Sequence, residues 1–286
     1  MPMCSTIIRD KSMLEIKPAQ VTPALRALFD PDMPTAIRCY SVLGGGNAGR
    51  IFTDDPDHPR CGYAWEQDDG TLYQGGVRDW ETVYQMVALL RQQGTVALDF
   101  RDGDAQVELF PPDPDAGMEC VELERPVGGS DIAAYLDKLP AGYEIHRMGR
   151  ALLEKSPRLD ETLFRYGSIE NYLEKGLDMC ILHGDEFVCE AGADMEVRGV
   201  RELGVVTERP YRGQGFATIA TAYLLKWCDE LGCATYWDCV KLNLGSLKIA
   251  RRLGFGNERG YKLLSWFPRR VWNPSGYNRP KIPMEA

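Results

Sequence analysis

The 286-residue sequence has no apolar run near the ~20 residues that a membrane-spanning helix needs. Residues 1–14 lack both a continuous apolar core and a small-residue cleavage site, so they do not have the pattern of a secretory signal. Only three histidines occur, none at ligand spacing from another, and we therefore expect no metal site. The nine cysteines contain no Cys-x-x-Cys pair. Their odd number and scatter predict reduced thiols and a cytoplasmic location.

Acidic residues outnumber basic ones by 42 to 33, and the excess lies in the N-terminal half. Residues 1–140 hold 12 Lys and Arg against 23 Asp and Glu, a net charge of −11. Residues 141–286 hold 21 against 19, a net charge of +2. An acidic half repels nucleic acid and attracts cations, so we expect no nucleic-acid partner. The plainer reading is that acidity keeps the protein soluble.

Proline and glycine divide the chain near its middle. The run Leu139-Pro140-Ala141-Gly142 interrupts regular structure, and the length suits two domains of about 150 residues each. We therefore expect an N-terminal α/β domain over residues 1–140 and a second domain over residues 141–286. In the first we expect strands at 50–53, 62–66, 71–74 and 96–100 and helices at 23–29, 36–43, 80–92 and 131–139, the last capped by Ser130. In the second we expect strands at 143–152, 178–183, 186–191, 202–207, 234–239 and 260–267 and helices at 160–165, 168–175, 216–231 and 246–253.

The most informative stretch is Arg212-Gly213-Gln214-Gly215-Phe216-Ala217. A short apolar run precedes it. A helix follows, with apolar residues at i, i+3, i+4, i+7, i+8, i+11 and i+15 from Phe216 to Leu231. The glycines therefore stand at a strand-to-helix junction, where bare N–H groups and the positive end of the helix dipole point to one place. Arg212 adds a planar cationic donor. The junction predicts an anionic, phosphate-bearing ligand.

Two other nucleotide-binding patterns fit this loop less well. Gly213-Gln214-Gly215 followed by Asp238 imitates a Rossmann fingerprint, but Thr218 stands at the last glycine position and residues 208–212 separate the strand from the glycines. A P-loop is excluded because no Gly-Lys-Ser/Thr closes the loop. The plain alternative is that the glycines serve ordinary turns.

A second block points to a particular family. Asn243 and Ser246 are followed by Ala250 and by Leu253-Gly254-Phe255. Arg212-x-x-Gly215-x-Ala217 and this block together resemble the pyrophosphate loop and the next strand–helix element of the GNAT superfamily of acyl-CoA-dependent N-acetyltransferases. The contexts Trp237-Asp238-Cys239 and Tyr211-Arg212-Gly213 are more narrowly similar to zwittermicin-resistance-type acetyltransferases. The resemblance covers residues 143–267 and is faint in the first half.

The resemblance implies an α/β (α+β) fold with a mixed, twisted GNAT-type sheet flanked by helices. It also implies that acetyl-CoA, the cosubstrate, binds between two splayed strands at 202–207 and 234–239, where pantetheine amides satisfy unpaired strand groups. A backbone N–H near Val205 or Val206 would hold the developing oxyanion. The implied cofactor-binding residues are Val205, Val206, Thr207, Arg212, Gly213, Gln214, Gly215, Phe216, Ala217, Thr218, Asn243 and Ser246.

Direct attack by an amine needs a base, because an alkyl amine with a pKa near ~10.4 is mostly protonated at neutral pH. Glu202, on the strand before the loop, is the implied base acting through water, and Glu208 is a weaker candidate; the plain alternative for Glu202 is an ion-paired carboxylate. Many family members carry a tyrosine seven residues after the asparagine, where this chain has Ala250. Tyr261, Tyr236 or water would then protonate the thiolate. Packing on the core is the plainer role for Tyr261.

The first half repeats the second loosely, with three strands, a helix and a strand. Its corresponding junction, Gly75-Gly76-Val77-Arg78-Asp79, lacks the Arg-x-x-Gly-x-Ala pattern. It is either a degenerate GNAT-like copy or an unrelated α/β accessory domain, and its acidity favours a cationic acceptor. The sequence thus predicts an N-acetyltransferase that acts on a primary amine of a small cationic molecule. The alternative is a non-catalytic acyl-CoA sensor, which Ala250 favours.

Overall fold

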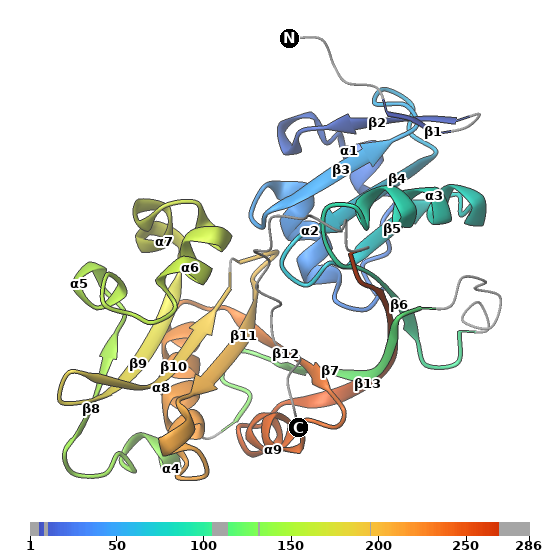
Figure 1. Cartoon of the computed structure of the whole chain (residues 1–286). Helices are drawn as coiled ribbons and strands as arrows, with labels where there is room; N and C mark the ends of the chain where they lie inside the picture. Colours follow the sequence, from blue (N-terminus) through green and yellow to red (C-terminus); the bar gives the residue numbers. More distant parts are fainter. Residues whose placement is uncertain (1–5, 9–10, 105–113, 131, 195, 269–286) are drawn as a thin grey trace, which may run out of the picture.

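The computed structural model describes residues 6–8, 11–104, 114–130, 132–194 and 196–268, which form two sheets with helices on their faces (Figure 1). A five-stranded sheet has the order β1-β2-β3-β4-β5, and an eight-stranded sheet has the order β6-β13-β7-β12-β11-β10-β9-β8. None of the described helices combines the length and the apolar character that crossing a bilayer requires.

The five-stranded sheet is antiparallel and is covered by helices on both faces. Side chains of α3 pack on one face around Phe52 and Trp65, and those of α1 and α2 pack on the other around Ile51 and Ala64. The elements are β1 (Thr6–Ile8), β2 (Lys11–Ile16), η1 (Pro18–Gln20), α1 (Pro23–Arg26), α2 (Ala36–Gly44), β3 (Gly49–Thr53), β4 (Cys61–Glu66), β5 (Leu72–Gly76) and α3 (Trp80–Leu90).

The eight-stranded sheet is antiparallel except where β11 and β12 run parallel. The long helix α8 packs on one face, and α5, α6 and α7 cover the other face over β9 and β10. Its strands are β6 (Val96–Arg101), β7 (Ala116–Arg125), β8 (Tyr143–Arg147), β9 (Leu177–His183), β10 (Glu186–Ala193), β11 (Val200–Thr207), β12 (Ala234–Val240) and β13 (Gly256–Trp266). The helices are α4 (Ala133–Leu136), α5 (Arg150–Leu153), α6 (Leu159–Tyr166), α7 (Ile169–Lys175), η3 (Arg209–Tyr211), α8 (Phe216–Glu230) and α9 (Leu244–Arg252).

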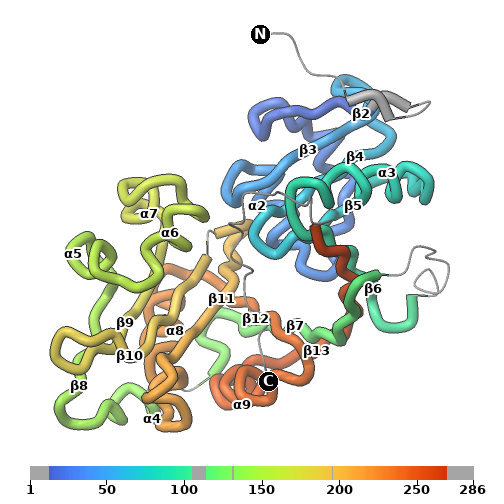
Figure 2. Tube along the Cα trace, viewed as in Figure 1, coloured from blue at the N-terminus to red at the C-terminus, as the bar shows by residue number. Residues whose placement is uncertain are grey.

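The two halves of the chain exchange strands. β7, from the N-terminal half, pairs with both β12 and β13, while β13, from the C-terminal half, lies between β6 and β7. Figures 1 and 2 show β13 running beside these two earlier strands. β6 and β7 precede residue 140, so the large sheet draws strands from both sides of the expected boundary. The division of the chain into domains at residue 140 stays a prediction.

Most predicted elements are confirmed, but β1, β2 and β7 were not predicted, and the helices expected at 23–29 and 131–139 are limited to Pro23–Arg26 and Ala133–Leu136. β7 was missed because prolines and acidic residues precede it, although it is a central strand of the large sheet. The predicted strand at 143–152 ends at Arg147 and is followed by α5. Ser130 does not cap α4; its hydroxyl instead donates to the carbonyl of Leu253, and Asp131 lies outside the described residues.

A buried ion pair anchors β7 to α8. The side chain of Arg125 is fully buried and donates to both carboxylate oxygens of Asp229, at 2.9 and 2.8 Å. Removing one partner leaves a buried charge without its counter-ion. Asp229→Ala should therefore lower the free energy of unfolding by about 3–5 kcal/mol in a urea titration. The neighbouring Glu230 makes only exposed ion pairs with Lys226 and Arg147. Glu230→Ala should cost below ~1 kcal/mol, and equal losses in the two variants would contradict this role for Arg125.

Candidate functional site

A cleft opens where β11 and β12 part. Their parallel ladder consists of three pairs and ends at Glu202↔Tyr236, although β11 continues to Thr207 and β12 to Val240. Beyond the last pair, the facing edges of the two strands are available to another extended chain. The structure thus has the splay expected from the sequence.

The loop after β11 leads into the uncovered N-terminus of α8. Gly213 and Gly215 have φ angles of +78° and +91°, and a Cβ added to either would meet nothing within 4 Å. Gly215 is the N-cap residue of α8, and no side chain caps the helix. A helix N-terminus with free N–H groups and open space before it suits a phosphate group.

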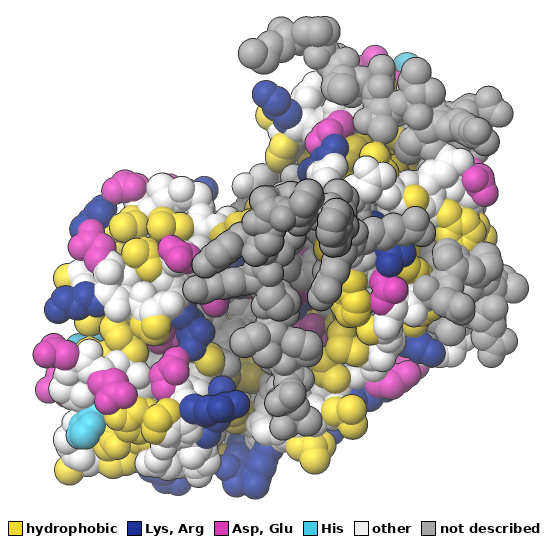
Figure 3. Space-filling model, in the orientation of Figure 1, with side chains coloured by type: hydrophobic (Ala, Val, Ile, Leu, Met, Phe, Trp, Pro, Cys, Tyr) yellow, Lys and Arg dark blue, Asp and Glu magenta, His cyan; other side chains and the backbone are white. Residues whose placement is uncertain are grey.

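Basic side chains surround this end of the cleft. Arg209, Arg212 and Lys248 are exposed, and Figure 3 shows Lys and Arg gathered along the lower edge of this face, where β11 and α9 lie in Figure 1. Arg212 donates from Nε to the carbonyl of Thr207 at 3.0 Å, which holds the side chain beside the end of β11. The arrangement favours a multiply charged anion.

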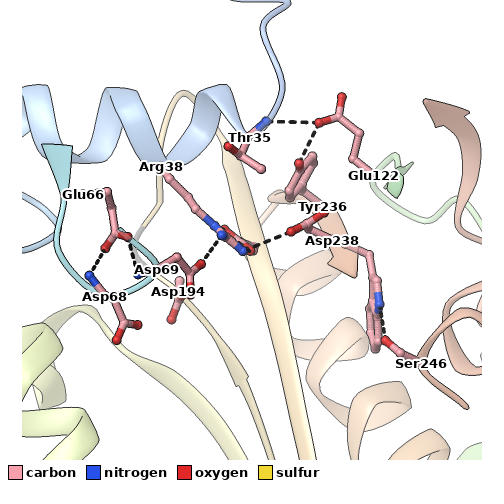
Figure 4. A network of polar contacts seen from close by, with 12 residues as sticks. Thr35, Arg38, Glu66, Asp68, Asp69, Glu122, Asp194, Tyr236, Asp238 and Ser246 are labelled. Carbon is pink, nitrogen blue, oxygen red and sulfur yellow. Dashed lines mark hydrogen bonds and ion pairs between the residues drawn. The ribbon is translucent and has the colours of Figure 1, made fainter. Parts of the chain in front are cut away.

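A network of charged side chains lies at the other end of the cleft, where α2 of the N-terminal half meets the large sheet (Figure 4). Arg38 of α2 donates from Nε to both carboxylate oxygens of Glu202, at 2.9 and 3.1 Å. It also forms an ion pair with Asp238 at 3.3 Å and another with Asp69. Glu202 is 8 % exposed. A cation from the first half of the chain therefore holds carboxylates of the second.

Asp238 has the electrostatics of an acid–base group. Burial raises the pKa of its carboxyl to about 7, and the nearby Arg38 opposes that rise. The hydroxyl of Tyr261 donates to Asp238 Oδ1 at 2.9 Å. A group that is half ionised near pH 7 can take up and release protons under physiological conditions.

A pocket of about 200 Å³ opens beside this network, on the face of the large sheet that α6 covers. Its walls come from α6, from β9 and β10, and from residues 204–206 of β11, so it adjoins the splay. Four acids line it, Glu161, Asp178, Glu190 and Asp194, against two arginines, Arg158 and Arg165. The excess of carboxyl groups favours a cationic occupant.

Burial also raises the pKa values of two acids that line this pocket. It raises the pKa of Asp178 to about 7, although Tyr172 donates to that carboxyl at 2.9 Å, and it raises the pKa of Asp194 to about 6 against the opposing charge of Arg165. The backbone N–H of Asp194 donates to the carbonyl of Glu202 at 2.7 Å, which ties the pocket to the charged network. An ammonium group in this pocket would thus lie near carboxyl groups able to take its proton.

One known protein family matches the part of the chain that holds the cleft. The family model for GNAT acetyltransferases matches residues 118–264, which is half of the chain. The chain belongs to the GNAT acetyltransferase family. The matched region begins within β7 and so includes the exchanged strand, the splay and the glycine loop.

Relatives agree with this family and its fold. An uncharacterized N-acetyltransferase, YdfB of Bacillus subtilis, is 26% identical over 128 residues, which are 44% of this chain; the chain spans about half (49%) of that relative. A GCN5-related N-acetyltransferase-like protein of Streptococcus suis has the same fold, with a TM-score of 0.65, 22% identity and coverage of 86% of this chain and 99% of that one. A tandem GNAT protein from the clavulanic acid biosynthesis pathway has a TM-score of 0.60 and 11% identity, covering 88% of this chain and 98% of that one. The tandem fold fits two GNAT-like halves here.

The predicted cofactor residues of this GNAT protein lie along the cleft in two groups. Val205, Val206 and Thr207 follow the splay, and Arg212 to Ala217 with Thr218 form the loop and the first turn of α8. Phe216 and Thr218 have buried side chains, so only their backbone groups are available to a ligand.

Asn243 and Ser246 lie at the N-terminus of α9, after β12. The side chain of Asn243 is the N-cap and accepts from the backbone N–H of Ser246 at 3.1 Å. The hydroxyl of Ser246 accepts from Trp237 Nε1 at 2.9 Å. Both residues thus stabilise α9, and their contact with the cofactor stays a prediction.

The two predicted catalytic residues belong to one chain of contacts. It runs from Tyr261 to Asp238, then to Arg38 and Glu202. Tyr261 is 2 % exposed, and burial together with Asp238 raises the pKa of its hydroxyl, which weakens it as a proton donor. Ala250 is fully buried. The position of Tyr261 favours a role in holding Asp238, and its role as an acid stays a prediction.

Sequence reasoning missed Arg38, Asp69 and Asp238 as site residues. Asp238 entered only in a rejected Rossmann pattern and in the Trp237-Asp238-Cys239 context, with no role assigned to it. It follows the last residue pair of the splay by two positions on β12. Arg38 is more than 160 positions from Glu202, and no local pattern links the two. The acidic loop 68–69 is held by its own contacts, since Glu66 accepts from the N–H groups of both residues. Within the described residues, no group of His, Cys, Asp and Glu could hold a metal ion.

Proposed function

We propose that this protein is an N-acetyltransferase that moves an acetyl group from acetyl-CoA to a primary amine of a small, cationic acceptor. The observation that carries the proposal is the splay of β11 and β12 between an uncovered helix N-terminus and an acidic pocket. The diphosphate would bind the N–H groups of residues 212–218, and the pantetheine would extend along the open edges of the two strands.

The acceptor would enter the acidic pocket and attack the thioester directly. The amine nitrogen forms a bond to the acetyl carbonyl carbon, the carbon–sulfur bond breaks, and the thiolate leaves. An N–H group at Val205 or Val206 would stabilise the oxyanion that forms on the carbonyl oxygen. A thiol with a pKa near ~8.5 is an adequate leaving group, so protonation by water suffices where Ala250 replaces the usual tyrosine.

We assign the removal of the amine proton to Glu202 and Asp238 acting together about Arg38. Glu202, acting through water, would be the carboxylate beside the pocket, because its charge acts on Asp194 of the pocket lining. Asp238 would supply a carboxyl group that gains and loses a proton near neutral pH. Arg38 would hold the carboxylate of Glu202 in place.

The acceptor class follows from the charge of the pocket and of the N-terminal half. A polyamine, an aminopolyol antibiotic or a basic peptide end carries the required charge. The eight cysteines among the described residues form no disulfide, and we infer that the enzyme acts in the reducing cytoplasm.

A thiol-release assay with acetyl-CoA and a panel of amines tests this function. We expect release with dicationic and polycationic amines and little with neutral or anionic ones. The matched variant Asp178→Asn should raise KM for the amine about tenfold and leave KM for acetyl-CoA unchanged. The substitution removes a carboxylate from the acceptor pocket and changes no residue at the proposed acetyl-CoA site. Tight binding of acetyl-CoA with no turnover on any amine would instead support an acyl-CoA sensor, the function that the buried Ala250 favours.

A further inference from the structure

The first half of the chain contains its own version of the splay. β5, α3 and β6 repeat the order of β11, α8 and β12, and a parallel bridge joins Thr71 to Ala97 where β5 and β6 begin. Asp99 follows the last bridged residue of β6 by two positions, as Asp238 follows Tyr236 in β12. A pocket of about 180 Å³ lies between the two strands and the start of α3. The pocket thus corresponds in position to the cofactor cleft of the second half.

This pocket has no place for a diphosphate. A Cβ on Gly76 would lie 2.2 Å from the carbonyl oxygen of Arg60, so the junction is covered by other backbone, unlike Gly213 and Gly215. The N–H groups of Gly76 and Val77 already donate to carbonyls, at 3.0 and 2.9 Å. Asp79 also places a carboxylate at the N-cap of α3, where it would repel an anion.

Most other side chains that line this pocket are apolar or acidic. Leu72, Val83 and Leu98 supply apolar wall, Trp80 supplies an aromatic ring, and four aspartates face the pocket, Asp30, Asp32, Asp99 and Asp104. A cavity of about 150 Å³ accepts a benzene ring, so the space suits a ligand with one ring. The walls and the acids together select an organic cation.

The two arginines of the lining already have partners, some of them in the same lining. Arg101 forms an ion pair with Glu122 at 2.6 Å and donates to the carbonyl of Asp32 at 2.7 Å, and Arg78 donates to Gln74 at 2.9 Å. Asp99 accepts from the neutral hydroxyl of Thr35 at 3.1 Å, and the charge of Arg101 opposes the rise in its pKa that burial causes. A ligand cation would add to this stabilisation of the carboxylate.

Thr35 is a strained residue that joins this pocket to the large sheet, because its backbone N–H donates to Glu122 at 3.2 Å. It is 2 % exposed and has a φ angle of +50°, an uncommon conformation for a β-branched residue. Its hydroxyl contacts both Asp99 and the hydroxyl of Tyr73, at 3.1 and 2.8 Å. Backbone strain of this kind collects at ligand-binding sites. The strained residue here directly holds the acid that faces the pocket.

We propose that the pocket between β5 and β6 binds a small primary ammonium compound with an apolar or aromatic body, at a site separate from the acetyl-transfer cleft. Its ammonium group would contact Asp99, and its body would lie against Leu72 and beside Trp80, over whose ring Arg78 lies at 5.3 Å. Coenzyme A would not bind there, because the N–H groups of Gly76 and Val77 are already bonded, other backbone covers Gly76, and Asp79 would repel the diphosphate.

Calorimetric titration of the full chain with phenethylammonium chloride, without acetyl-CoA, tests the proposal. We expect a binding event that Asp99→Asn weakens at least tenfold and that Asp178→Asn, in the acceptor pocket, leaves within twofold. The neutral isostere 2-phenylethanol should not produce it, and coenzyme A should not compete. Unchanged binding in Asp99→Asn, or loss of binding only in Asp178→Asn, would overturn the proposal.

A second pair of variants covers the case in which Asp99→Asn fails to fold. Gln74 lines the same pocket at the rim and is partly exposed. Gln74→Lys places a competing cation beside the ligand and should abolish binding, whereas Gln74→Glu should retain or strengthen it. Equal affinity in these two variants would show that charge at this pocket does not control binding, and the proposal would fail.

Discussion

Gly215→Glu should lower the affinity of the protein for acetyl-CoA by about 100-fold or more, measured by isothermal titration. The glutamate carboxylate would stand where the diphosphate docks, and like charges brought together cost several kcal/mol. The open space before Gly215 admits the side chain, so the loss would come from charge and from occupation of the anion site rather than from a clash with the protein.

The matched control lies at the other end of the same helix. Gly232 has a φ angle of +72° and the same open space about its Cα, so Gly232→Glu introduces equal backbone strain and charge away from the cleft. We expect Gly232→Glu to bind acetyl-CoA as the wild type does and to lose a similar amount of thermal stability. If both variants bound equally well, the helix N-terminus would not be the diphosphate site.

Glu202→Gln should lower kcat by about 100-fold or more while KM for acetyl-CoA stays unchanged, because general bases contribute roughly 10²–10⁴ in rate. The change also removes one of the charges that Arg38 contacts. Asp238→Asn keeps the size of the side chain and should lower kcat less at high pH than Glu202→Gln does. Retained activity in Glu202→Gln would leave the enzyme assignment intact and remove Glu202 as the base.

The pH dependence of the reaction separates the roles of the two acids. Burial raises the pKa of Asp238 to about 7, so this carboxyl is protonated below that pH and ionised above it. We therefore expect kcat/KM at fixed amine concentration to rise as pH increases through about 7 and then to level off. Asp238→Asn should reduce this step to the part that Asp178 of the acceptor pocket contributes, because burial raises the pKa of that carboxyl to about 7 as well, whereas Asp99→Asn should keep the full step. A step of unchanged size in Asp238→Asn would assign the titration to another group.

The sequence predicted those parts of the site that depend on neighbours along the chain. The glycine loop, α8 and the capped start of α9 follow from local rules of conformation and periodicity, and the structure confirms these elements at nearly the predicted positions. The arrangement of β11 and β12 came from the family resemblance, and their short ladder agrees with it. The same reasoning missed β7, whose flanking prolines and glycines suggested an irregular segment.

By itself, then, the sequence determined the glycine loop and the helix start at which we propose that the diphosphate binds, because free N–H groups at a helix start are a property of consecutive residues. The tertiary structure alone decided the acid–base network and the exchange of strands between the halves. Arg38 reaches Glu202 and Asp238 only because α2 packs against the large sheet, and β13 lies between β6 and β7 only through pairing across more than 130 residues. Burial then shifts the pKa of Asp238, and burial depends on contacts that no local pattern records.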